Sequence, residues 1–138
     1  MEITAARDLR EEIQTLERRM ETLRATAQDL VPIRDGLPKG KVTSSAVERL
    51  AVKILNLEEY LRGLQEKLAA VKIHLIEEIS AAPLKEMERR VLMMRYVNCM
   101  RFRDICFDLN KSDARIYQWH RAGLEKMRDY STLTVALE

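Results

Sequence analysis

The chain has 138 residues, of which 46% are hydrophobic, 33% charged and 5% aromatic, with 4 Gly, 3 Pro and a net charge of +2. Because this composition is rich in helix formers and poor in helix breakers, it predicts an all-α protein with long helices. No apolar run approaches the roughly 18–20 residues of a membrane span, and the first ten residues carry charge where a signal peptide needs apolar residues. We therefore expect a cytoplasmic protein with no membrane partner.

The positive charge is unevenly distributed. Residues 1–82 hold 13 Lys and Arg against 14 Asp and Glu, whereas residues 89–128 hold 10 against 4. A basic segment of this kind is typical of a module that meets an acidic polymer such as nucleic acid.

Residues 6–30 have a heptad pattern in which apolar residues alternate at spacings of three and four. Charged residues fill the other positions, so the pattern predicts a helix with one narrow apolar seam that faces a partner helix. The seam residues are Ala6, Leu9, Ile13, Leu16, Met20, Leu23, Ala27 and Leu30.

Residues 31–45, VPIRDGLPKGKVTSS, contain two prolines and two glycines and are predicted to form a loop. Ser45 and Glu48 fit a capping box at the start of a second helix, expected over about residues 46–80. This helix repeats the heptad pattern through Val47, Leu50, Ile54, Leu57, Leu61, Leu64, Leu68, Val71 and Leu75.

Two long helices joined by a loop predict an antiparallel helical hairpin, a coiled coil over residues 1–82. The second helix also carries apolar residues off its seam, namely Ala51, Leu55, Ile73 and Ile76. This extra surface favours a homo-oligomer that forms through the coiled coil.

Pro83 is expected to end the coiled coil, and residues 83–138 to form a second domain. The pattern predicts a helix over 84–97, a short connection, and a short helix over 101–109. The buried sides would hold Met87, Val91, Leu92 and Met94, then Phe102, Ile105, Cys106 and Leu109. Asn110 suits a left-handed turn and Ser112 an N-cap.

The next helix, over 113–129, has an apolar stripe of Ile116, Trp119, Gly123, Leu124 and Met127. Trp119 lies in the middle of this stripe, so we expect it in the core, and Gly123 would let another helix approach closely. For His120 a phosphate contact or a pH response is open, and a partly exposed helix histidine is the expectation.

A short helix, a tight turn and a longer helix with a polar N-terminal face predict a helix-turn-helix, whose second helix would lie in the major groove of DNA. Gln118 could pair with an adenine edge and Arg121 with a guanine or a phosphate. The candidate base-reading residues are Asp113, Ala114, Tyr117, Gln118 and Arg121. The candidate phosphate contacts are Arg95, Arg101, Arg103, Lys111, Ser112 and Arg115.

Residues 84–128 resemble region 4 of the bacterial sigma-70 family. The resemblance is carried by ERRVLMMRY at 88–96, FRDIC at 102–106, SDARI at 112–116 and LEKM at 124–127. The whole layout is similar to phage and prophage transcriptional regulators of the ArpU/RinA kind. The resemblance implies a DNA-binding regulator of phage genes, with double-stranded DNA as a partner and RNA polymerase as a further candidate partner.

Two departures from the sigma factors narrow this expectation. Where they carry Arg and Glu near the start of the recognition helix, this chain has Asp113, Ala114 and Tyr117, with Gln118 kept. Residues 1–82 also hold a single aromatic residue, so the segment that opens promoter DNA is missing. We therefore do not expect a complete sigma factor or its usual promoter element.

The leading hypothesis is thus a sequence-specific DNA-binding transcriptional regulator. The alternative is a non-catalytic adaptor that binds RNA polymerase or another regulator through the coiled coil and the region-4-like module. We expect no enzyme, cofactor or metal, because no phosphate loop, metal-ligand spacing or nucleophile elbow is present. For Cys99 and Cys106, a disulfide, a zinc site and a catalytic thiol are conceivable, and two reduced, mostly buried thiols are the expectation.

Overall fold

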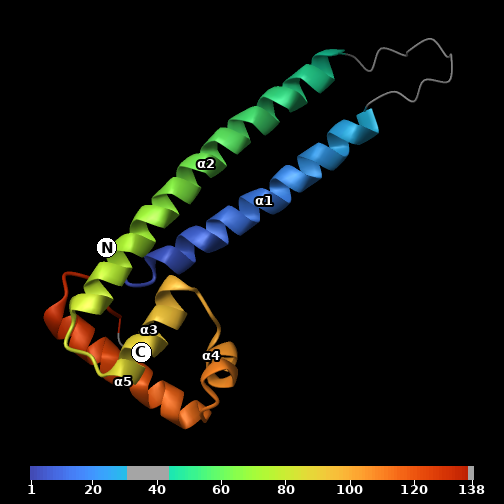
Figure 1. Ribbon diagram of the computed structural model, residues 1–138. Helices are drawn as coiled ribbons and strands as arrows, with labels where there is room; N and C mark the ends of the chain where they lie inside the picture. The colour runs from blue at the N-terminus through green and yellow to red at the C-terminus, as the bar shows by residue number, and fades with distance from the viewer. Residues whose placement is uncertain (31–43, 137–138) are drawn as a thin grey trace. The chain divides into compact units, whose positions relative to one another are not determined.

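The computed structural model describes residues 1–30 and 44–136, and these ranges are all-helical apart from turns and short connections. This confirms the predicted all-α class. An isolated bridge between Glu2 and Thr134 is the sole β-type pairing in the described ranges. The elements in chain order are α1 (Ala5–Leu30), α2 (Ser44–Ala81), α3 (Glu86–Leu92), the π-helical η1 (Met93–Val97), α4 (Phe102–Leu109) and α5 (Asp113–Tyr130) (Figure 1).

The two long helices, α1 and α2, have 26 and 38 residues. Every residue that the heptad pattern assigned to a seam is buried or half-buried in its helix. Residues 31–43 of the predicted loop over 31–45 lie outside the described residues. Its last two residues already belong to α2, which begins at Ser44, so Ser45 lies in the first turn and is not the N-cap.

Residues 11–66 form one of two compact units. Its buried side chains are Ile13, Met20, Leu61 and Leu64. Arg24 donates to Glu58 at 2.7 Å, and the Tyr60 hydroxyl donates to Glu12 at 3.2 Å. The hydrogen bond and the negative charge of Glu12 raise the pKa of Tyr60 above its ordinary value.

Residues 1–10 and 67–138 form the second compact unit. The Ile3 amide donates to the Thr134 carbonyl at 3.0 Å, so the two ends of the chain lie together in this unit. This unit includes Pro83 and the residues on both sides of it. Its core combines the N-terminal residues, the end of α2 and the C-terminal helices, through Ile3, Ala6, Leu75, Ile79, Ala82, Leu84, Leu92, Tyr96, Val97, Leu124, Met127 and Leu133.

Helices α3 and α5 pack closely in this unit, because Gly123 has no side chain. A Cβ atom at Gly123 would lie 3.0 Å from Leu92 Cδ1, which confirms the expected close approach. The predicted helix over 84–97 is divided into α3 and a π turn. That turn ends where the Asn98 amide donates to the Met93 carbonyl at 3.0 Å, and Cys99 then takes a positive φ of 57°.

None of the helices in the two described ranges is both long enough and apolar enough to cross a membrane.

Candidate nucleic-acid interface

The connection between α4 and α5 is a tight turn. Asn110 ends α4 in the left-handed conformation, with φ 52° and ψ 49°, as its residue type suggested. The side chain of Ser112 then accepts a hydrogen bond from the Arg115 amide at 3.3 Å, so Ser112 is the N-cap of α5 as predicted. The direction in which α5 leaves the turn is therefore set by local contacts.

Helices α3, α4 and α5 pack around three fully buried residues, one from each helix: Val91, Ile105 and Ile116. Trp119 lies at the edge of this cluster and is half-buried, with the Arg115 guanidinium 5.6 Å from its ring centre. It was predicted to lie in the core, but the centre of the cluster is filled by the smaller Ile116. Trp119 thus covers the cluster from one side.

The five candidate base-reading residues all lie on the solvent side of α5. Asp113, Ala114, Tyr117, Gln118 and Arg121 are each exposed. The Tyr117 ring rests on Phe102, with ring centres 4.7 Å apart, and Arg121 lies 3.5 Å from Glu125. The side chain of Gln118 forms no hydrogen bond within the described residues.

Asp113 is the acidic member of this face, and it also affects a thiol. Burial raises the pKa of Cys106, and a hydrogen bond to the Asp113 carboxylate together with its negative charge raises it further. Both Cys106 and Cys99 are free and half-buried. A raised pKa disfavours the reactive thiolate form of Cys106.

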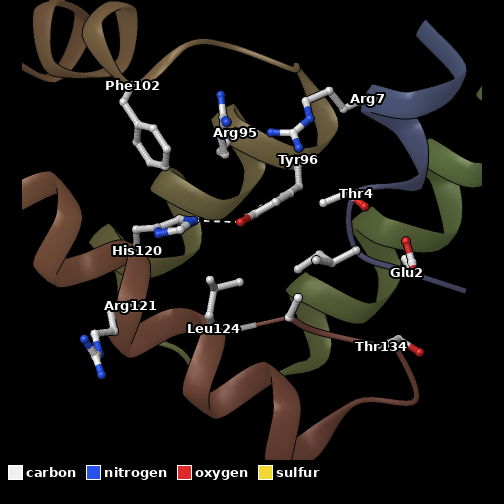
Figure 2. A pocket seen from close by; sticks show the side chains of 12 residues that line it. Glu2, Thr4, Arg7, Arg95, Tyr96, Phe102, His120, Arg121, Leu124 and Thr134 are labelled. Atoms are coloured by element: carbon white, nitrogen blue, oxygen red, sulfur yellow. Dashed lines mark hydrogen bonds between the residues drawn. The ribbon is translucent and has the colours of Figure 1, made fainter. Parts of the chain in front are cut away.

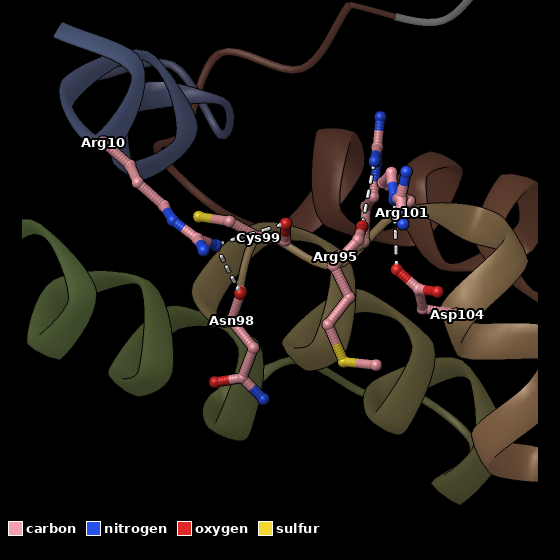
Figure 3. Close-up of polar contacts among 7 residues, drawn as sticks. Arg10, Arg95, Asn98, Cys99, Arg101 and Asp104 are labelled. Atoms are coloured by element: carbon pink, nitrogen blue, oxygen red, sulfur yellow. Dashed lines mark hydrogen bonds and ion pairs between the residues drawn. The ribbon is translucent and has the colours of Figure 1, made fainter. Parts of the chain in front are cut away.

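Five of the six candidate phosphate contacts are exposed: Arg101, Arg103, Lys111, Ser112 and Arg115. Arg101 pairs with Asp104 at 3.1 Å. Arg95 differs because it is half-buried and donates a hydrogen bond of 2.9 Å to the Met100 carbonyl (Figure 3). Its guanidinium also lies 4.4 Å from the centre of the Phe102 ring. Its guanidinium holds the connection between η1 and α4.

A cluster of rings around His120 is not evident from the sequence. Tyr96 Oη and His120 Nε2 are hydrogen-bonded at 2.7 Å, and the Phe102 ring meets the imidazole edge to face at 4.8 Å. The three residues come from η1, α4 and α5, so no spacing along the chain brings them together. The one available signal was that six of the seven aromatic residues lie beyond residue 95.

A cavity of about 180 Å³ borders this cluster, within the unit formed by residues 1–10 and 67–138. Its lining includes the polar side chains of Arg7, Tyr96 and His120 and the apolar side chain of Leu124 (Figure 2). Ile3 also lines it. Arg10 donates to the Asn98 carbonyl at 3.2 Å, so α1 also holds the end of η1 (Figure 3).

In the part of the chain that the structure describes, no group of His, Cys, Asp and Glu side chains is placed to hold a metal ion. No protein-family model, no curated protein and no solved structure matches this chain.

Proposed function

We propose that this protein is a sequence-specific DNA-binding transcriptional regulator of phage or prophage genes. Helices α4 and α5 would form its helix-turn-helix, with α5 in the major groove. The observation that carries the proposal is the two-sided character of the first turns of α5. Ile116 is fully buried there, while the residues facing away from it are exposed and mostly polar.

The dimensions of α5 suit this role. Its 18 residues span about 27 Å at the usual helical rise, and the major groove is wide enough to admit a helix. In such docking the N-terminal residues of the helix reach the base edges. Gln118 would pair with an adenine, and Arg121 would exchange its weak, exposed pairing with Glu125 for a guanine or a phosphate.

Exposed cations near the turn support the same proposal. Arg103 and Lys111 form no ion pair within the described residues, so their charges are available to phosphates without breaking an existing contact. Arg115 follows Ser112 in the first turn of α5, where a phosphate would also meet the positive end of the helix. Such contacts fix the position of a protein on DNA and make its affinity depend on salt.

The long helices would serve assembly. We place α1 and α2 in an antiparallel coiled-coil hairpin whose outer surface joins copies of the chain. Support comes from the burial pattern, because the seam residues are covered while Leu55, Ile73 and Ile76 are exposed.

The test is to select bound fragments from a random DNA pool with the full-length chain. A selected motif would support the proposal, and failure to enrich any sequence at about 50 mM salt would refute it. Gln118→Ala and Arg121→Ala should each cost about 1–3 kcal/mol at the selected site and relax preference at one position. Arg128→Ala, on an exposed residue in the last turn of α5, is the matched control and should leave binding unchanged.

A second candidate function is an adaptor that binds RNA polymerase or another regulator. It is favoured by Phe107 on α4, which is 85% exposed, and by the carboxylate of Asp113 on the face that would meet DNA. An apolar contact through Phe107 would be insensitive to salt, whereas binding to phosphates weakens steeply as salt rises. Phe107→Ser should abolish partner binding under the adaptor hypothesis and leave DNA affinity unaltered under the first.

A further inference from the structure

Helix α2 carries a second stripe on the side away from its heptad seam. Its exposed large aliphatic side chains are Val52, Leu55, Ile73 and Ile76, which are 55, 63, 58 and 41% exposed. With the 3.5-residue repeat of a supercoiled helix, they share one side of α2 with four further exposed residues. The full stripe is Val52, Leu55, Glu59, Arg62, Glu66, Ala69, Ile73 and Ile76.

The spacing of this stripe reads the same in both directions along the helix, as 3, 4, 3, 4, 3, 4 and 3. A second α2 laid against it in the antiparallel sense, centred at the level of Leu64, therefore meets it in register. Val52 then lies opposite Ile76 of the other copy, and Leu55 lies opposite Ile73. The four large aliphatic residues are thus matched with one another, whereas Ala69 lies opposite Glu59.

The two charges nearest the centre of the stripe, Arg62 and Glu66, obey the same symmetry. Arg62 and Glu66 are equidistant from the level of Leu64, so each lies opposite the other residue type in the antiparallel pair. Both are exposed, and neither forms an ion pair within the described residues. A parallel pair in register would instead place Arg62 beside Arg62 and Glu66 beside Glu66, which like-charge repulsion disfavours.

We infer that the stripe binds a second copy of this chain, antiparallel, with two Arg62–Glu66 ion pairs at the centre and aliphatic contacts at both ends. This deepens the proposed self-association by assigning its surface and register, and it does not depend on DNA binding. A wholly apolar partner or a lipid surface fits less well, because either would leave the central charges desolvated and unpaired.

The test uses charge reversal in the full-length chain and sedimentation equilibrium over about 1–100 µM. The unmodified chain should form a dimer. Arg62→Glu and Glu66→Arg should each weaken the dimer by roughly tenfold or more, because each places like charges opposite one another. The double variant R62E/E66R should recover the affinity of the unmodified chain, and an equimolar mixture of the two single variants should form a heterodimer.

Lys67→Glu is the matched control, since it reverses a charge on an exposed α2 residue outside the stripe. It should leave the dimer intact, and circular dichroism should show equal helix content in all variants. A monomer at every concentration overturns the inference together with self-association. If neither single reversal weakens the dimer, the stripe is not the dimer surface. If both single reversals weaken the dimer and the double variant does not restore its affinity, the proposed register is wrong. A failed DNA selection leaves these results unaffected.

Discussion

Lys126 of α5 donates a hydrogen bond of 2.6 Å to the carboxylate of Glu88, which is only 3% exposed. The same carboxylate oxygen accepts a bond of 2.9 Å from the Lys85 amide, at the start of α3. Glu88 therefore both caps α3 and ties it to α5. Burying a carboxylate is costly unless it is paired and hydrogen-bonded, so these contacts are what make its position tolerable.

Replacing Glu88 by Ala should lower the free energy of unfolding by about 1–3 kcal/mol, because the substitution removes two hydrogen bonds to a charged group. Urea unfolding followed by circular dichroism measures this. Arg90→Ala is the control, since it breaks an exposed pair with Glu86 on the same helix and should cost less than about 0.5 kcal/mol. Equal losses of unfolding free energy in the two variants would show that the Glu88 contacts contribute no more than an exposed ion pair.

The Glu88 contacts also predict how stability depends on pH. Burial raises the pKa of this carboxyl, but the hydrogen bonds and charges of Lys126 and Lys85 outweigh burial and hold the pKa below the ordinary value of 4.5. A carboxyl with a depressed pKa in the folded state stabilises the protein above its unfolded pKa, and this contribution disappears as pH falls below it.

Unfolding free energies measured between pH 7 and pH 3 should therefore fall in the unmodified chain as the pH drops below about 4.5. Glu88→Gln keeps the shape of the side chain and cannot titrate, so its loss of stability over the same range should be smaller. Parallel curves for the two proteins would show that another group dominates the acid response.

The features that the sequence predicted well are those that short-range patterns determine. Heptad spacing identified the covered sides of α1 and α2 because helical periodicity is a local property. Asn110 and Ser112 were assigned correctly because turn and cap preferences depend on a few neighbouring residues.

The features that were missed depend on contacts between distant segments. Ile3 joins the core of the C-terminal helices, and Tyr96 meets His120 across 24 residues of chain. Neither contact produces a periodic pattern in the sequence. Trp119 lies on the predicted side of α5. How deeply it is buried depends on how closely α3 and α4 pack against α5, and the apolar stripe of α5 does not determine that distance.

The two glycines of the described helices should respond to alanine in opposite ways. Gly123→Ala places a methyl group 3.0 Å from Leu92, a fully buried side chain, and should cost about 1–3 kcal/mol by overpacking. Gly63 has no heavy atom within 4 Å of the same position, so Gly63→Ala should stabilise α2 by about 0.5–1 kcal/mol through helix propensity. Thermal unfolding at one protein concentration compares them, and a neutral Gly123→Ala would contradict the close packing of α3 and α5.

Cation removal near the turn should change how DNA binding responds to salt. If Arg103 and Lys111 contact phosphates, replacing either by Ala should weaken binding uniformly across sequences and reduce the slope of log affinity against log salt by about one. Fluorescence anisotropy between 50 and 200 mM salt measures the slope. Arg90→Ala removes an equal charge from an exposed residue of α3 and should leave the slope unchanged, unless the whole surface acts as a diffuse basic field.

Asp113 should affect both thiol reactivity and DNA binding. Its carboxylate helps to raise the pKa of Cys106, so Asp113→Asn should lower that pKa, increase the thiolate fraction at about pH 8 and speed reaction with a disulfide reagent. Replacing Cys99 by Ser in both proteins isolates the signal of Cys106. The same substitution removes a negative charge from the face proposed to meet DNA, so affinity at low salt should rise. Faster thiol reaction with unchanged DNA affinity would remove Asp113 from the DNA-facing surface while keeping its contact with Cys106.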